Sequence, residues 1–177
     1  MTLYFLTGNQ KKFLEVKEIF VNVEQKKIDL PEIQELDAQK IIEQKLFVAQ
    51  GQLSEPFFCE DVSLEISCLN GFPGPLVKWF LQSLSCQQIS KIVTRYSDHR
   101  AKAVCHIGYF DGETTHILRA EVSGTIVPPR GSQAFGFDSI FLPDGFEKTF
   151  AELSRKEKSQ ISHRALALQK LKALITS

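Results

Sequence analysis

The chain has 177 residues, with 21 basic and 21 acidic side chains and a formal net charge of zero. This balance gives no overall field to attract nucleic acid or an anionic membrane, so an anionic ligand needs a local arrangement of side chains. Its length suits a single domain, residues 1–177, with a substantial core.

The cysteines and the apolar runs bear on location. The four cysteines show no CxxC pair and no zinc-ligand spacing, which is typical of reduced thiols inside a cytosolic protein. No apolar run approaches the length of a membrane span, and the first residues lack a signal-peptide pattern. We therefore expect a cytoplasmic protein without nucleic-acid or membrane partners.

The first predicted unit is a strand, a tight turn and a helix. Residues 3–6 form a short apolar run, residues 7–9 a turn, and residues 10–20 carry apolar side chains at helical spacing. Lys11 and Lys12 fall in the first helical turn, where positive charge opposes the helix dipole unless an anion compensates it. This helix start is a candidate phosphate site. An ordinary junction with two exposed lysines is the alternative.

Two further segments follow. Residues 27–33 predict a short strand that breaks at Pro31, with Glu32 just past the break. Residues 38–50 predict a helix with one apolar stripe, and Lys45 lies at the edge of that stripe. Taken locally, Lys45 is best explained as a lysine whose aliphatic stem covers apolar surface.

Residues 57–80 carry the most informative pattern. An apolar run, residues 57–59, predicts a strand that emerges at Glu60 and Asp61. Neighbouring residues on a strand face opposite sides, so one carboxylate can face a ligand or a divalent cation. A glycine-proline turn then leads to Lys78, whose neighbours look buried, which would anchor its ammonium near the acids. A lysine beside such acids indicates a phosphate site, and a solvated strand end is the alternative.

The second half of the chain predicts a helix, a hairpin and a helical end. Residues 86–96 have helical spacing, and the runs 101–110 and 114–123 flank Asp111-Gly112, a strong hairpin signal. Residues 124–131 predict a strand that ends in prolines. The histidines of the hairpin are expected to be structural.

Two later segments could contact a ring. Residues 135–138, Phe-Gly-Phe-Asp, could present an aromatic face to a flat heterocycle, although core packing explains most phenylalanines. A polar stretch then precedes an apolar C-terminal helix. Within this stretch, Lys158, His163 and Arg164 bring hydrogen-bond donors to the helix start, where a phosphate or a ring carbonyl oxygen could bind. A solvated, charged helix face is the alternative.

Six segments in this order resemble the signature of a known family. They are TGNQKK (7–12), IDLPE (28–32), EDVSL (60–64), GFPGPLVKWF (71–80), FGFD (135–138) and EKSQISHR (157–164). Together they resemble the inosine triphosphate pyrophosphatase family, whose members remove non-standard purine nucleotides. The resemblance covers essentially the whole chain and is strongest to the eukaryotic type.

The resemblance implies a fold and a reaction. The fold would be mixed α/β, with a long curved mixed sheet flanked by helices and two lobes around a central active-site cleft. The protein would be a homodimer. It would hydrolyse ITP, dITP and XTP to the monophosphate and pyrophosphate, with Mg²⁺, or Mn²⁺ in its place, as cofactor.

The resemblance also implies roles for residues. Glu32 and Asp61 would bind the metal, and Asp61, Lys12 and Glu60 would be catalytic, with Asp61 orienting the attacking water. The segment 135–138 would form the wall on the base side, and the 6-oxo group would be read by His163 and Arg164. The substrate-binding residues would be Thr7, Gly8, Asn9, Gln10, Lys11, Lys12, Lys45, Asp61, Val62, Lys78, Phe135, Gly136, Phe137, Asp138, Lys158, His163 and Arg164.

One position departs from the family pattern. Many members carry serine or threonine directly after the paired acids, whereas Val62 stands there in this chain and Ser63 follows it. Two alternatives therefore stay open. The chain could bind nucleotides for regulation with weak or no turnover, or it could act on other modified nucleotides.

Overall fold

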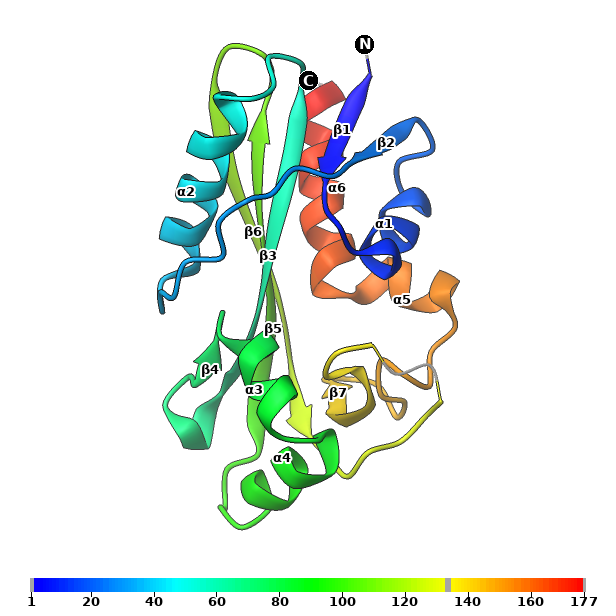
Figure 1. Cartoon of the computed structure of the whole chain (residues 1–177). Helices are drawn as coiled ribbons and strands as arrows, with labels where there is room; N and C mark the ends of the chain where they lie inside the picture. Colours follow the sequence, from blue (N-terminus) through cyan, green and yellow to red (C-terminus); the bar gives the residue numbers. More distant parts are fainter. Residues whose placement is uncertain (1, 133–134, 177) are drawn as a thin grey trace.

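The computed structural model describes residues 2–132 and 135–176 (Figure 1). Its centre is a mixed seven-stranded sheet with the order β2-β1-β3-β5-β6-β7, and β4 pairs with β3. The strands are β1 (Leu3–Leu6), β2 (Val23–Lys26), β3 (Phe57–Ile66), β4 (Pro73–Gly74), β5 (Arg100–Phe110), β6 (Thr115–Ile126) and β7 (Phe141–Pro143).

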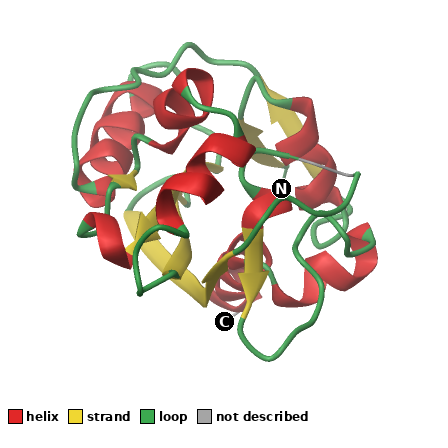
Figure 2. Cartoon of the chain, turned by 90° about the horizontal axis from the view of Figure 1, so that it is seen from below, coloured by secondary structure: helices red, strands yellow, loops and turns green. Residues whose placement is uncertain are grey.

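Helices cover both faces of the sheet, as Figure 2 shows from below. They are α1 (Gln10–Lys17), α2 (Ala38–Gln50), α3 (Val77–Ser83), α4 (Cys86–Val93), α5 (Arg155–Ile161) and α6 (His163–Thr176), with short 3₁₀ turns η1 (Ser67–Leu69) and η2 (Asp138–Ile140). None of the helices in the described part of the chain has the length and apolar composition that a membrane crossing requires.

Alternation along β3 divides the upper core between two helices. Phe57 and Cys59 pack in the cluster that contains Ile42 and Leu46 of α2. Phe58 packs on the other face, in the cluster that contains residues of α6. Because successive strand side chains face opposite ways, one apolar run supplies both layers.

A third cluster forms the lower part of the molecule. It joins Leu64 and Ile66, at the far end of β3, to α3, α4 and the segment around β7. The long strands β3, β5 and β6 run through both parts in Figure 1, so they hold the upper and lower clusters in one sheet.

The edge of β3 is interrupted in a way that matters for the site. One edge pairs with β5 along the whole strand, residues 57–66. The other edge pairs with β1 only at residues 57–58 and with β4 only at residues 64–65. Between these two ladders, no strand of the described chain pairs with residues 59–63 on that edge. Side chains from both faces of β3 can therefore reach the same gap.

The best-signalled elements are confirmed. The helix predicted over residues 38–50 is α2, and the predicted hairpin is the antiparallel pair β5 and β6. The helices predicted over 10–20 and 86–96 end earlier, as α1 and α4, at Lys17 and Val93.

The strand predicted over residues 27–33 was wrong. The second strand is β2, Val23–Lys26, which pairs in parallel with all four residues of β1. Past Lys26 this neighbour has ended, and Pro31 has no N–H to donate to a ladder. Residues 27–37 therefore form a loop, and Glu32 lies within it.

Three other predictions also need correction. The strand at the paired acids does not end there, because β3 continues to Ile66 alongside β5. Only residues 124–126 of the strand predicted over 124–131 are extended in the sheet, as the end of β6. The polar stretch before the last helix is itself a helix, α5, which Ser154 starts through a capping box with Glu157.

Candidate active site

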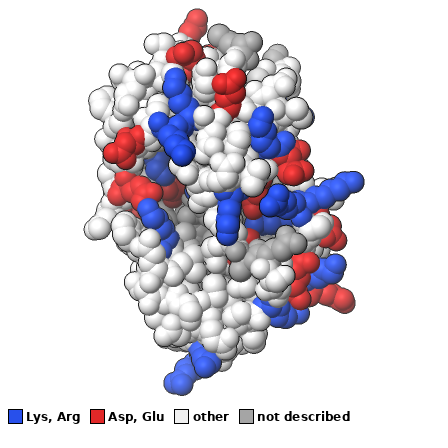
Figure 3. Space-filling model, turned by 45° about the vertical axis from the view of Figure 1, so that its right-hand side comes forward, with Lys and Arg blue, Asp and Glu red and all other residues white. Residues whose placement is uncertain are grey.

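A cavity of about 900 Å³ opens at the gap along β3. Its wall draws on the turn before α1, the loop containing Glu32, helices α2 and α3, and the start of α6. In Figure 3, acidic and basic side chains are interspersed over the upper and middle parts of one face, while much of the lower part is uncharged. The cavity is thus a charged pocket between the upper and lower core clusters.

The structure brings most of the predicted site residues to this one wall. The lining includes the metal candidate Glu32 and, from the predicted substrate-binding set, Thr7, Gly8, Asn9, Gln10, Lys11, Lys12, Lys45, Asp61, Val62, Lys78, Phe135, Gly136, Phe137, Asp138, His163 and Arg164. Glu60 and Lys158 are not part of the lining. Instead, Glu60 and Lys158 form ion pairs with residues that do line the cavity.

The turn before α1 is shaped by Asn9. Its side-chain oxygen caps the helix by accepting from the backbone N–H groups of Lys11 and Lys12, at 3.0 and 3.3 Å. The cap therefore engages two of the backbone N–H groups that a helix start would otherwise offer to a phosphate. A Cβ atom added at Gly8 would meet open space. The lysine side chains remain the main cationic groups at this end.

Glu60 and Asp61 face opposite sides of β3, as predicted from their adjacency. Glu60 is 5% exposed and accepts from Nε and Nη2 of Arg164 at 2.8 and 2.9 Å. It also pairs with Lys12 at 3.0 Å. Glu60 therefore does not join Asp61 in one acidic cluster: it fixes Arg164 and Lys12 from behind the cavity wall.

These contacts settle the ionisation of Glu60. Burial alone would raise the pKa of the Glu60 carboxyl, but Arg164 and Lys12 outweigh that effect and hold the pKa well below its usual range. Glu60 is consequently a carboxylate at all physiological pH values.

The other carboxylates of the cavity pair with lysines. Asp61 Oδ1 accepts from Lys45 Nζ at 2.8 Å, and the same ammonium donates to the backbone oxygen of Glu60 at 3.1 Å. Lys45 is thus a cavity residue rather than a surface lysine. Lys78 pairs with Glu32, not with the acids of β3 as the sequence suggested. Asp61 Oδ2 is buried and has no hydrogen-bond partner among the described residues.

The base-side candidates form an aromatic and imidazole stack. The His163 ring packs against Phe137 and Phe150, with ring centroids 5.8 and 5.9 Å away. Burial, together with Arg164 and Lys158, lowers the pKa of His163 well below its ordinary value, so its ring is neutral. Its Nδ1 is buried without a hydrogen-bond partner in the described chain.

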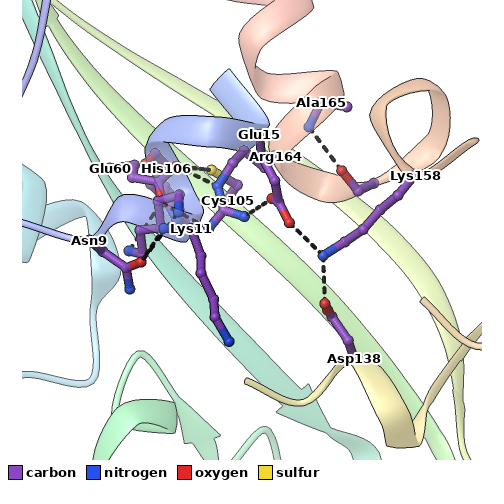
Figure 4. A network of polar contacts seen from close by, with 12 residues as sticks. Asn9, Lys11, Glu15, Glu60, Cys105, His106, Asp138, Lys158, Arg164 and Ala165 are labelled. Atoms are coloured by element: carbon purple, nitrogen blue, oxygen red, sulfur yellow. Dashed lines mark hydrogen bonds and ion pairs between the residues drawn. The ribbon is translucent and has the colours of Figure 1, made fainter. Parts of the chain in front are cut away.

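A buried chain of ion pairs joins Asp138 and the start of α6 to helix α1 (Figure 4). Lys158 donates to Asp138 at 2.6 Å and to Glu15 at 2.7 Å, and Arg164 Nη1 contacts the other oxygen of Glu15. Lys158 lies behind Asp138 as seen from the cavity and lines a neighbouring pocket. Lys158 thus forms ion pairs with two acids, and its contact with the ligand stays a prediction.

The sequence did not single out Glu15. Burial opposes its ionisation, but Arg164 and Lys158 lower its pKa, so it bridges these two cations as a carboxylate. The only local signal is its position three residues after Lys12, on the same side of α1. That spacing alone would not distinguish it from a solvated glutamate.

Asp138 gives a testable pH dependence. Burial raises the pKa of Asp138 to about 6, even though Lys158 favours the charged form. The folded state therefore binds more protons than the unfolded chain between the two pKa values, and stability falls as the pH rises from about 4 to about 6. We expect wild type to lose about 2 to 3 kcal/mol relative to Asp138→Asn over this range.

This prediction is checked by urea unfolding of both proteins from about pH 4 to pH 8. Asp144→Asn, in an exposed loop, is the control and should track wild type. A constant difference between wild type and Asp138→Asn across that range would contradict the assigned pKa.

The two residues after the paired acids, Val62 and Ser63, lie on different sides of β3. Val62 lines the cavity beside Asp61. Ser63 does not: it is 1% exposed, and it lines a separate pocket that also contains His106 and Arg119. The Ser63 hydroxyl therefore does not take the place of the serine or threonine hydroxyl that many family members carry at the position of Val62.

Lysines paired with carboxylates lie on the wall of one cavity together with aromatic side chains, and this combination defines the class of this protein. It is a mixed α/β protein whose pocket suits a ligand that carries both anionic groups and a flat ring.

Comparison with known sequences gives the family. The pattern of the Ham1 family matches residues 3–174, and the chain belongs to that family. It is 38% identical to the inosine triphosphate pyrophosphatase of Pyricularia oryzae, over 97% of this chain and 92% of the relative. It is 36% identical to the inosine triphosphate pyrophosphatase of Schizosaccharomyces pombe, over 99% and 96%.

A solved structure agrees with the fold. A HAM1 protein from Coxiella burnetii matches with a TM-score of 0.81 and 27% identity, over 99% of this chain and 98% of the other. The predicted mixed α/β fold and the predicted family are confirmed.

Proposed function

We propose that this chain hydrolyses non-standard purine nucleoside triphosphates (ITP, dITP and XTP) to the monophosphate and pyrophosphate. The observation that carries the proposal is the single cavity wall that gathers Lys12, Lys45, Lys78 and Asp61 together with the segment 135–138. The near full-length similarity to inosine triphosphate pyrophosphatases supports it. We further propose that residues 1–177 act as one domain, in a cytoplasmic homodimer.

The described residues fit a divalent cation bound together with a nucleotide. No group of three or more acidic, histidine or cysteine side chains suited to a metal is present among residues 2–132 and 135–176. Mg²⁺ commonly takes one or two carboxylates and completes its shell with water and substrate phosphates. Asp61, with its unpartnered Oδ2, and Glu32 would hold the ion, and Mn²⁺ is a second candidate. The ion would neutralise phosphate charge when bound.

The chain's own residues have roles in the reaction. The ammonium groups of Lys12, Lys45 and Lys78 would bind phosphate oxygens and stabilise the charge that develops on the leaving pyrophosphate. Asp61 would orient the attacking water and accept its proton. The new bond joins the water oxygen to the α-phosphorus, and the bond from that phosphorus to the bridging oxygen breaks, which releases pyrophosphate.

Base selection would come from the donors at the start of α6. Hypoxanthine and xanthine carry an oxygen acceptor at position 6, whereas adenine carries an amino donor there and would leave a protein donor unpaired, at a cost of about 1 to 3 kcal/mol. Arg164 is held on Nε, Nη1 and Nη2 by Glu60 and Glu15, so its plane is fixed before a ligand binds. Fixed donors discriminate better than mobile ones.

The proposed function is tested by incubating the protein with ITP, XTP, dITP, ATP and dTTP, with and without Mg²⁺, and measuring pyrophosphate and monophosphate. Pyrophosphate from ITP and hardly any from ATP is the expected result. Tight binding of ITP without release would instead favour the nucleotide-binding alternative that Val62 leaves open. Release from dTTP in preference to ITP would favour the other open alternative, a pyrophosphatase that acts on other nucleotides.

His163→Ala is expected to narrow the preference for ITP over ATP by about tenfold, because it removes the imidazole that closes the base-side wall. The ratio of kcat/KM for ITP to that for ATP measures the effect. His116→Ala, in the β5–β6 hairpin and outside the cavity lining, is the matched control. Equal losses on ITP and ATP would argue against base recognition by His163.

A further inference from the structure

Three lysines of the cavity are already paired with carboxylates. Lys45 pairs with Asp61 at 2.8 Å, Lys12 pairs with Glu60 at 3.0 Å, and Lys78 pairs with Glu32. The cationic groups that would bind a polyphosphate are thus engaged by acids, two of which, Glu32 and Asp61, are the candidate metal ligands. A free polyphosphate must compete with these acids for the lysines.

We propose that this pairing makes the site selective for a polyphosphate that arrives with a divalent cation. The cation takes the carboxylates while the phosphates take the lysines, so every charge keeps a partner. Either ligand alone would leave charges unpaired at the cavity wall, which is costly where solvent is limited. Metal and polyphosphate therefore strengthen each other's binding. This inference rests on the proposed function for the identity of the ligand.

The three lysine–carboxylate pairs differ in how strongly they couple metal binding to polyphosphate binding. The side chains of Lys78 and Glu32 are 54% and 53% exposed, so water can solvate either when its partner leaves. Glu60 keeps two hydrogen bonds from Arg164 when Lys12 turns to a phosphate. These two pairs contribute little to the coupling.

The pair of Lys45 and Asp61 is the one that couples the two ligands. Their side chains are 11% and 16% exposed, and Lys45 is the only hydrogen-bond partner that the described chain provides to the Asp61 carboxylate. When Lys45 turns to a phosphate, Asp61 is left as a poorly hydrated, unpaired anion beside it. A cation on Asp61 removes this penalty.

Binding of inorganic pyrophosphate tests the coupling without any turnover. Isothermal titration in EDTA and in Mg²⁺ should show that wild type binds pyrophosphate well only with the metal. Asp61→Asn frees Lys45, and we expect it to bind metal-free pyrophosphate at least about tenfold tighter than wild type, with little further gain from Mg²⁺. Glu32→Gln should gain much less.

Glu35→Gln is the matched control for the charge change. Glu35 lies in the same loop as Glu32 but outside the cavity lining, as does its lysine partner, Lys40, so the variant loses one negative charge without freeing a cavity lysine. Its affinity for metal-free pyrophosphate should stay within about threefold of wild type. An equal gain in Asp61→Asn and Glu35→Gln would show a general charge effect and overturn the proposal.

The reciprocal measurement uses the metal alone. Because coupling is mutual, Lys45→Gln should bind Mn²⁺ about tenfold tighter than wild type when no phosphate is present, as followed by electron paramagnetic resonance of free Mn²⁺. Lys148→Gln, an exposed lysine paired with Glu157, should match wild type. Unchanged Mn²⁺ binding in Lys45→Gln would also overturn the proposal. If Asp61→Asn binds pyrophosphate more tightly and Lys45→Gln binds Mn²⁺ more tightly, but ITP is not hydrolysed, the proposed function fails and the coupling of metal and polyphosphate binding stands.

Discussion

Asp61→Asn is expected to lower kcat for ITP by about 10³-fold or more while the fold is retained. The carboxylate lies at the open gap of β3, where its charge would hold the cation and orient the attacking water. An asparagine keeps the size of the side chain and loses both functions. Its partner Lys45 keeps a hydrogen bond to the backbone oxygen of Glu60, so the local structure has support without the charge.

The test is steady-state hydrolysis of ITP in Mg²⁺, with circular dichroism and urea unfolding to confirm the fold. Asp144→Asn, an exposed loop residue, should hydrolyse ITP as wild type does. Turnover by a folded Asp61→Asn within about tenfold of wild type would remove Asp61 from the centre of the reaction.

Glu60→Gln is expected to destabilise the protein by about 3 to 5 kcal/mol. Glu60 accepts from Arg164 at 2.8 and 2.9 Å and pairs with Lys12 at 3.0 Å, at a position that is 5% exposed. A neutral amide would leave the buried guanidinium with the charge of Glu15 alone. The loss is large because a buried charge is left with too little compensation.

The measurement is urea unfolding near pH 7, with Glu121→Gln as the control. Glu121 makes the same kind of pair with Lys102 and Arg119, but at the surface, where about 1 kcal/mol or less is expected. Similar losses in Glu60→Gln and Glu121→Gln would contradict a dominant buried pair.

The pH dependence follows from the lowered pKa of Glu60. Its stabilisation is fully present above the pKa of an unfolded glutamate, about 4.3, and is lost as the pH falls through the lower pKa of the folded state. The difference between wild type and Glu60→Gln should therefore be constant from about pH 5 upwards and should shrink in acid.

Local patterns predicted the elements that are stabilised locally. The apolar stripe of residues 38–50 predicted α2 with its observed bounds, and the structure shows that Asp37 caps this helix. The Asp111-Gly112 turn likewise predicted the pairing of β5 and β6. The missed second strand shows the limit. Residues 23–26 are extended because β1 lies beside them, and a neighbour in space is not visible in the local sequence.

The site was predicted as a set of residues more accurately than as a set of contacts. The family resemblance named the charged and polar residues of the cavity lining, including Lys45, which local pattern alone assigned to the surface, but it left out most of the apolar ones. It did not predict that Glu60 turns to Arg164 or that Glu15 bridges Arg164 and Lys158. These contacts join α1, β3, α5 and α6, so they depend on the packing of segments far apart in sequence. The Asn9 cap of α1 was missed too, although it is a local contact.

The interrupted edge of β3 sets a constraint on how this protein can vary. Adding ladder residues to β1 or β4 would normally strengthen a sheet, but here a longer neighbour would fill the space through which Asp61 and Lys45 reach the cavity. Sheet continuity and access to the reacting groups are mutually exclusive along these few residues. Stabilising substitutions should therefore be sought elsewhere in the molecule, because closing this seam would trade activity for rigidity.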